Sequence, residues 1–204
     1  MEGILARKYI NDIKKELFRK TIHLCTAAIP FLLSLAYVPV MALLLAALVL
    51  YSLSELLRLK GINIPLVSKI TVTAARKRDE GRFVLGPITL VLGILLTAGI
   101  FQPRACAFCG IYAQAFGDGL ASLVGKVFGT HKIPCTKGKS VEGSLACFAA
   151  IWASTLLLVP QTDWKICLVL ALCGTLTEVL PLKDFDNVLI PLLIAAVAHV
   201  GFGL

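Results

Sequence analysis

The run from Thr21 to Ser54 contains no Asp, Glu, Lys or Arg over 34 residues. A single helix that crosses a bilayer needs only about 20 residues, so the run is too long for one span. The segment Tyr37-Val38-Pro39 lies near its middle, and proline both breaks a helix and restricts the residue before it. We therefore expect two transmembrane helices here, over residues 21–37 and 39–57.

The rest of the chain continues as apolar runs separated by charged connectors. Hydrophobic residues make up 58% of its 204 residues, and charged residues make up 16%, against about 25% in soluble domains. Further spans are expected at residues 83–101, 105–122, 141–159, 165–180 and 188–204. The sequence thus predicts an all-α fold: a polytopic integral membrane helical bundle of about seven transmembrane helices, with residues 1–204 forming one membrane domain.

Basic residues are distributed unevenly between the connectors. Of the 20 Lys and Arg residues, 18 fall in segments 1–20, 58–82, 126–139 and 181–187. The two others are Arg104 and Lys165. By the positive-inside rule, this bias predicts a cytoplasmic N-terminus and places those four segments in the cytoplasm. The same rule accounts for the net charge of +8, so we expect no nucleic-acid partner.

Residues 1–20 are expected to form a cytoplasmic amphipathic segment that precedes the transmembrane core, residues 21–204. Ile10, Ile13 and Leu17 recur at helical spacing, with several Lys and Arg residues beside them. Such a helix could lie in the headgroup region. It could equally be a cytoplasmic extension of the first transmembrane helix, and the sequence leaves both alternatives open.

Acidic residues gather at the cytoplasmic ends of the predicted spans: Glu55, Asp118, Glu142 and Glu178. A charge at the bilayer centre costs about 2.5–3.5 kcal/mol, so burial in a shared polar site would explain these placements. Each could instead be a helix-end charge that reaches the headgroups. For Glu55 this alternative is favoured by Arg58, three residues later, because such a pair supports itself on a helix.

The segment from Gly117 to Ser144 combines glycine, lysine and carboxylate. Its six glycines allow a ligand to approach the backbone closely, and its four lysines are point charges suited to phosphate. Ser140 can cap the fifth span, whose first N–H groups would then form an anion site. Asp118 and Glu142 provide hard oxygen ligands of the kind that Mg²⁺ prefers. Phosphate, metal and membrane together suggest chemistry between a nucleotide and a lipid headgroup.

Two soluble nucleotide-binding motifs are excluded. Gly138-Lys139-Ser140 resembles the end of a P-loop, but Ile133 stands where that pattern needs its first glycine. Gly117 and Gly119 begin a dinucleotide fingerprint, but Ser122 occupies the position of its third glycine.

Six elements in order resemble the polyprenol kinase family, which includes dolichol, phytol and farnesol kinases and CTP-dependent diacylglycerol kinases. Residues 16–23 (ELFRKTIH) are similar to its R-K-x-x-H element, and residues 117–129 match G-D-x-x-A-S-x-x-G-x-x-F-G. Residues 139–144 match K-S-x-E-G-S, and residues 186–191 match D-N-x-x-I-P. The other two elements are Glu55 with Arg58, and Glu80 with Gly81, Gly86 and Gly93. Glu178 precedes the last motif and is counted with it.

This resemblance implies a lipid kinase that transfers the terminal phosphate of a nucleoside triphosphate, CTP in the family, to a membrane lipid alcohol. The alcohol would be an isoprenoid of polyprenol or phytol type, or diacylglycerol. The cofactor would be Mg²⁺ or another divalent cation, and the site would face the cytoplasm. The implied catalytic residues are Asp118, Glu178 and Asp186, and the implied metal ligands are Asp118, Glu142, Asp186 and Asn187. The implied nucleotide-binding residues are Arg19, Lys20, His23, Gly117, Gly119, Ser122, Gly125, Lys126, Lys137, Lys139, Ser140, Gly143 and Ser144.

Several roles stay open at this level. Either Glu178 or Asp186 could accept the proton of the lipid hydroxyl. Asn187 could bind metal or cap the last helix, and the Arg19–His23 element could bind phosphate or anchor the first span.

Two other functions also remain possible. A phosphatidate cytidylyltransferase would use CTP but leave CMP on the lipid. A transporter would use buried carboxylates, although the outward halves of the predicted spans carry almost no ionisable groups. The oligomeric state is open, with a homodimer as one alternative.

Overall fold

The computed structural model describes residues 2–65, 67, 71, 73, 79, 81–101, 104–136, 138–160 and 162–202. Within these ranges the protein is helical, and the only β pairing is one isolated bridge between Lys132 and Ser140. The α-helices are α1 (Glu2–Cys25), α2 (Ile29–Leu35), α3 (Tyr37–Leu59), α5 (Gly86–Ile100), α6 (Arg104–Tyr112), α7 (Gly119–Val127), α8 (Val141–Leu158), α9 (Trp164–Val179) and α10 (Asp186–Phe202). The all-α prediction is therefore confirmed for these residues.

The first predicted span is continuous with the segment before it. Helix α1 runs without interruption from residue 2 to Cys25 and passes through a short 3₁₀ turn, Thr26–Ala28, into α2. This continuity favours a helical extension over a separate interfacial helix. The break before α3 lies at Ala36, whose φ of −150° and ψ of 77° leave the helical region. Pro39 then sits in the first turn of α3, where its missing N–H costs nothing.

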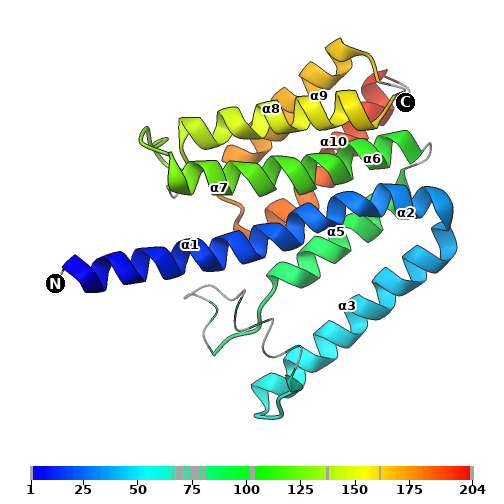
Figure 1. Cartoon of the computed structure of the whole chain (residues 1–204). Helices are drawn as coiled ribbons and strands as arrows, with labels where there is room; N and C mark the ends of the chain where they lie inside the picture. The colour runs from blue at the N-terminus through cyan, green and yellow to red at the C-terminus, as the bar shows by residue number, and fades with distance from the viewer. Residues whose placement is uncertain are drawn as a thin grey trace.

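Helices α6 and α7 form one rod, joined by a π-helical segment, Ala113–Asp118 (Figure 1). Helix α1 packs along the α7 half of this rod, and α8 packs on α7 from another direction. A π-helical stretch within an α-helix is uncommon and often marks a functional site. Here it carries two buried polar side chains, Gln114 and Asp118.

The core lies where α6, α8, α9 and α10 meet. Ile151, Leu170 and Ile194 are fully buried there. Two glycines of neighbouring helices also pack against α10. A Cβ atom at Gly93 would collide with the backbone oxygen of Asn187, and a Cβ atom at Gly110 would collide with that of Pro191. The two glycines therefore bring α5 and α6 into backbone contact with α10.

Helix α3 leans away from the other helices (Figure 1) and packs mainly on α2 and α5. Its other faces expose large apolar side chains, among them Leu43 and Leu50. At its end, Glu55 accepts hydrogen bonds from Arg58 (2.6 and 2.8 Å) and from the backbone N–H of Val84 (2.8 Å). Glu55 therefore ties α3 to the segment before α5, in addition to pairing with Arg58 as the sequence suggested.

Among the described residues, three helices are long and apolar enough to cross a membrane: Tyr37–Leu59, Val141–Leu158 and Lys183–Gly201. They correspond to the predicted spans 39–57, 141–159 and 188–204. Helix α5 is apolar but shorter. Length and composition, with the apolar surface of α3, indicate a membrane protein.

Candidate active site

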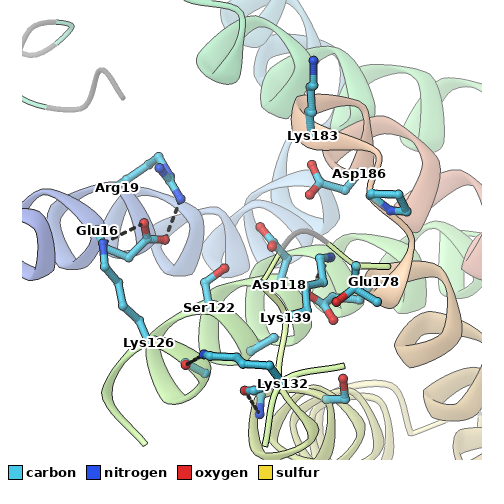
Figure 2. A pocket seen from close by; sticks show the side chains of 18 residues that line it. Glu16, Arg19, Asp118, Ser122, Lys126, Lys132, Lys139, Glu178, Lys183 and Asp186 are labelled. Carbon is cyan, nitrogen blue, oxygen red and sulfur yellow. Dashed lines mark hydrogen bonds and ion pairs between the residues drawn. The ribbon is translucent and has the colours of Figure 1, made fainter. Parts of the chain in front are cut away.

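A cavity of about 420 Å³ opens at the end of the bundle where α8 and α10 begin and α9 ends. Its size falls in the range of sites that bind small ligands. Basic and acidic side chains from separate segments converge on it (Figure 2). The charged residues that line it are Glu16, Arg19, Asp118, Lys126, Lys132, Lys139, Glu178, Lys183 and Asp186.

Helix α1 forms one wall. Arg19 and Glu16 are one helical turn apart and pair at 2.5 Å, and Lys126 of α7 approaches Glu16 at 3.8 Å (Figure 2). Glu16 therefore holds two cations of the cavity, one from each helix.

Asp118 is paired with side chains of α1. Its Oδ2 lies 2.5 Å from Lys20 Nζ and 3.1 Å from His23 Nδ1. All three residues are buried. A buried charge is tolerated only when paired and hydrogen-bonded, and this network meets that condition. It joins the R-K-x-x-H element of α1 to the G-D element of the π-helical segment.

Backbone N–H groups in the first turn of α8 already donate hydrogen bonds within the protein. Ser140 is its N-cap, and its Oγ accepts from the backbone N–H of Gly143 at 3.2 Å, as the sequence indicates. The N–H of Val141 donates to the backbone oxygen of His131 (3.0 Å). An anion in the cavity would therefore meet fewer free backbone N–H groups than expected. In contrast, Ser144 Oγ lines this wall and is buried without a hydrogen-bond partner among the described residues.

Glu142 faces the loop that precedes α8. Its carboxylate accepts from the Thr130 hydroxyl (2.6 Å) and from the backbone N–H of Thr130 (3.2 Å), and it lies 2.7 Å from His131 Nδ1. Glu142 is not among the residues that line the cavity. In this arrangement it pins the loop to α8, and its expected role as a metal ligand stays a prediction.

Lys139 and Glu178 form the opposite wall. Lys139 Nζ lies 2.8 Å from Glu178 Oε1 (Figure 2). Glu178 is almost fully buried at the end of α9, whereas Lys139 is partly exposed. The lysine of the K-S-x-E-G-S element is therefore already paired with the glutamate that precedes the last motif.

Asn187 anchors the start of α10. Its Nδ2 donates to Thr89 Oγ1 (3.0 Å) and to the backbone oxygen of Gly86 (3.4 Å), both on α5. Its own backbone oxygen would normally accept from residue 191, but Pro191 has no N–H. Gln114 Nε2 fills this place at 2.6 Å. The D-N-x-x-I-P element is thereby tied to both α5 and the π-helical segment, with Asp186 next to the anchor.

The structure gathers most of the predicted site residues around this cavity. Those that line it are Arg19, Asp118, Ser122, Gly125, Lys126, Lys139, Ser140, Gly143, Ser144, Glu178 and Asp186. Lys20, His23 and Asn187 lie behind it, in contact with a second cavity described below. Lys137 lies outside the described residues.

Gly117 and Gly119 line neither cavity. A Cβ atom at Gly117 would press on Ile151, and one at Gly119 would touch Leu24. These two glycines allow close helix packing on either side of Asp118, a need that a motif pattern does not distinguish from ligand contact.

Sequence reasoning did not select Glu16, Gln114 or Lys183 as site residues, and it named Lys132 only as one of four lysines suited to phosphate. Gln114 had a usable signal, because a lone amide inside an apolar span needs a partner just as a carboxylate does. Lys183 had no such signal, since the charge bias of the connectors already explains a lysine there.

The carboxylates that face the cavity are Glu16, Asp118, Glu178 and Asp186. Among the described residues, no group of three His, Cys, Asp or Glu side chains is arranged to hold a metal ion by itself. Mg²⁺ is commonly held by one or two carboxylates together with substrate phosphates and water. A site of that shared kind fits Asp118 and Asp186, whereas an all-protein metal cage does not.

Comparisons with known proteins find relatives that are named phytol kinase and dolichol kinase. The chain is 33% identical over 131 residues to a phytol kinase of Synechocystis, matching 59% of this chain and 56% of that protein. It is 27% identical over 160 residues to the chloroplastic phytol kinase 1 of Arabidopsis thaliana (71% and 53%). A dolichol kinase of Arabidopsis thaliana is 26% identical over 206 residues, covering 94% of this chain and 34% of that protein. The chain belongs to the polyprenol kinase family.

These named relatives confirm the resemblance to the polyprenol kinase family that the six sequence elements indicated. The chain spans about half the length of the phytol kinases it matches. No family model and no solved structure matches the chain.

Proposed function

We propose that this chain is the catalytic core of a lipid alcohol kinase. It transfers the terminal phosphate of a nucleoside triphosphate to the hydroxyl group of a membrane isoprenoid alcohol. The observation that carries the proposal is the 420 Å³ cavity, where five basic and four acidic side chains converge at one end of a membrane bundle. Phosphoryl transfer consists mostly of positioning and charge neutralisation, and this charge mixture suits both.

The basic wall is the proposed phosphate site. Lys126, Lys132 and Lys139 surround the cavity together with Arg19 and Lys183, and the unpartnered hydroxyl of Ser144 adds a donor. CTP is proposed as the donor on the family resemblance alone, because no described residue of the cavity has a clear role in reading a base.

Asp118 and Asp186 are the proposed metal ligands. A divalent cation bound with the triphosphate would neutralise charge on the transferred phosphate. Lys20 and His23 hold Asp118 in place from behind. Asp186 is the proposed acceptor of the hydroxyl proton, because it lines both the large cavity and the small cavity described below.

The proposed topology has seven transmembrane spans, a cytoplasmic N-terminus and a cytoplasmic active site. The five basic residues of the cavity belong to the chain ends and connectors that carry most of the Lys and Arg residues. A nucleotide from the cytosol and an alcohol from the inner leaflet would meet there.

The test is an assay of the purified protein in lipid nanodiscs. Labelled CTP, ATP or GTP is combined with phytol, a dolichol or diacylglycerol, with and without Mg²⁺. We expect labelled monophosphate on an isoprenoid alcohol, abolished by Asp118→Asn and Asp186→Asn. Asp163→Asn is the matched control: Asp163 is exposed and caps α9, and asparagine caps equally well. Cytidine in the lipid product would instead indicate a cytidylyltransferase, and activity retained in both site variants would refute the assigned roles.

A further inference from the structure

A second cavity, of about 50 Å³, adjoins the first. The two share Arg19, Asp118 and Asp186 in their walls. The second cavity is otherwise formed by α1, the start of α5 and the segment that leads into α10. The two proposed metal-binding carboxylates therefore stand between a large polar cavity and a small one.

The residues that line the small cavity are of two kinds. Four of them are apolar: Ile22, Val84, Pro87 and Leu90. The other side chains are polar or charged: Arg19, Lys20, His23, Asp79, Asp118, Asp184, Asp186 and Asn187. A ligand that suits both kinds has an apolar chain that ends in one small polar group.

Volume narrows the choice further. One water-sized group needs roughly 10–15 Å³ of such space, so 50 Å³ accommodates about four. That is enough for a hydroxyl group and the first few carbons of a chain. It is too small for a nucleotide, and too narrow for a glycerol backbone that carries two ester groups.

We propose that this cavity between α1 and α5 receives the hydroxyl end of a single-chain lipid alcohol, the acceptor of the reaction. This assignment rests on the proposed function. Ile22 and Leu90 form the wall that selects a slender chain over diacylglycerol, and Asp186 faces the hydroxyl.

Ile22 lies at the start of the first predicted span, residues 21–37. A lipid chain that leaves the cavity beside Ile22 towards the following residues would therefore continue into the bilayer. The alcohol would enter sideways from the bilayer while the nucleotide enters from the solvent.

The reaction balances with these groups. The hydroxyl oxygen of the alcohol forms a bond to the terminal phosphorus of the triphosphate, and the bond from that phosphorus to its bridging oxygen breaks. The hydroxyl proton passes to the Asp186 carboxylate, and the nucleoside diphosphate leaves through the large cavity.

Filling the small cavity tests the proposal. Ile22→Trp places a larger side chain in the small cavity. Ile22 is half-buried, so the fold can accommodate the tryptophan ring. We expect KM for phytol to rise about tenfold or more, as for a clash of one or two methylene groups, with KM for the nucleotide unchanged. Leu172→Trp, on an exposed position of α9, is the control for the added ring.

Leu90→Ala tests the same wall in the opposite direction, because it widens the cavity. We expect it to raise the activity with diacylglycerol relative to phytol. The inference is overturned if Ile22→Trp leaves KM for phytol unchanged. It is also overturned if Leu90→Ala lowers the activity with phytol and with diacylglycerol equally, or leaves the preference between these two substrates unchanged.

A binding measurement separates this inference from the proposed function. Phytol alone should raise the Tm of the wild type but not that of Ile22→Trp. If this shift appears while no alcohol is ever phosphorylated, the proposed function fails and the alcohol site stands. If lipid phosphate forms but Ile22→Trp keeps the full Tm shift, the alcohol site fails and the kinase stands.

Discussion

Lys139 and Glu178, 39 residues apart in the sequence, meet at 2.8 Å in one wall of the larger cavity. One of the cations that face the cavity is therefore already paired before the nucleotide arrives. A phosphate group would have to compete with the carboxylate for the same ammonium group.

The first prediction concerns this competition. Glu178→Gln should lower KM for the nucleotide roughly threefold to tenfold, because freeing a partly exposed lysine is worth about 1 kcal/mol. Lys139→Met should raise the same KM. Steady-state kinetics with varied nucleotide measures both. A higher nucleotide KM in Glu178→Gln would show that the carboxylate itself holds the nucleotide or its metal.

A second prediction concerns the buried pair of Lys20 and Asp118. Lys20→Met leaves the carboxylate without its strongest partner and should lower the free energy of unfolding by about 3–5 kcal/mol. The double variant Lys20→Met/Asp118→Leu should recover most of that loss, because an apolar pair of similar volume is often equally stable. Neither variant should transfer phosphate.

Thermal unfolding in detergent, followed by the fluorescence of the two tryptophans, measures these changes. A double variant that is no more stable than Lys20→Met would contradict the idea that charge burial limits stability here.

The third prediction concerns Gln114 and Pro191. Gln114→Leu leaves the backbone oxygen of Asn187 without a donor, which should cost about 1–3 kcal/mol. Pro191→Ala in the same background restores the helical N–H and should recover part of the loss. Stability measurements on the two single variants and the double variant give the coupling between the sites. If the stability changes of the two single variants simply add in the double variant, the Gln114 amide does not replace the missing N–H of residue 191.

A fourth prediction tests the orientation. Cys135 is exposed in the loop between α7 and α8, which the charge bias places in the cytoplasm. A membrane-impermeant maleimide should label it in inside-out vesicles and not in right-side-out ones. Cys135→Ser is the control for the other cysteines. Labelling from the outer side alone would reverse the proposed topology.

Local signals in the sequence were enough for the helical class and several boundaries. Proline placed the break between the first two spans within a few residues of Ala36, because its effect acts on its own neighbours. Ser140 was recognisable as a cap for the same reason. The carboxylates Asp118 and Glu178 stood out because an acidic residue in an apolar run needs an explanation.

Pairings over long distances were beyond such reasoning. Nothing near Lys20 indicates that its partner is Asp118, 98 residues away. Glu142 had the right chemistry for a metal, but whether it turns to the cavity or to Thr130 depends on the course of a loop. The seven-span count likewise depends on where each connector begins and ends. Helices α5 and α9 are both shorter than a full membrane crossing.

The π-helical segment Ala113–Asp118 has a consequence for how this site can change over time. A π-helical turn is closed by an i→i+5 hydrogen bond and so holds about one residue more than an α-helical turn. The segment can therefore absorb one extra residue while the helices on either side keep nearly the same direction and phase. Deleting one of its residues would return the rod to regular α-helix and remove the widened turn that carries Gln114 and Asp118. These two side chains could thus be brought to the site, or lost from it, by a single inserted or deleted codon.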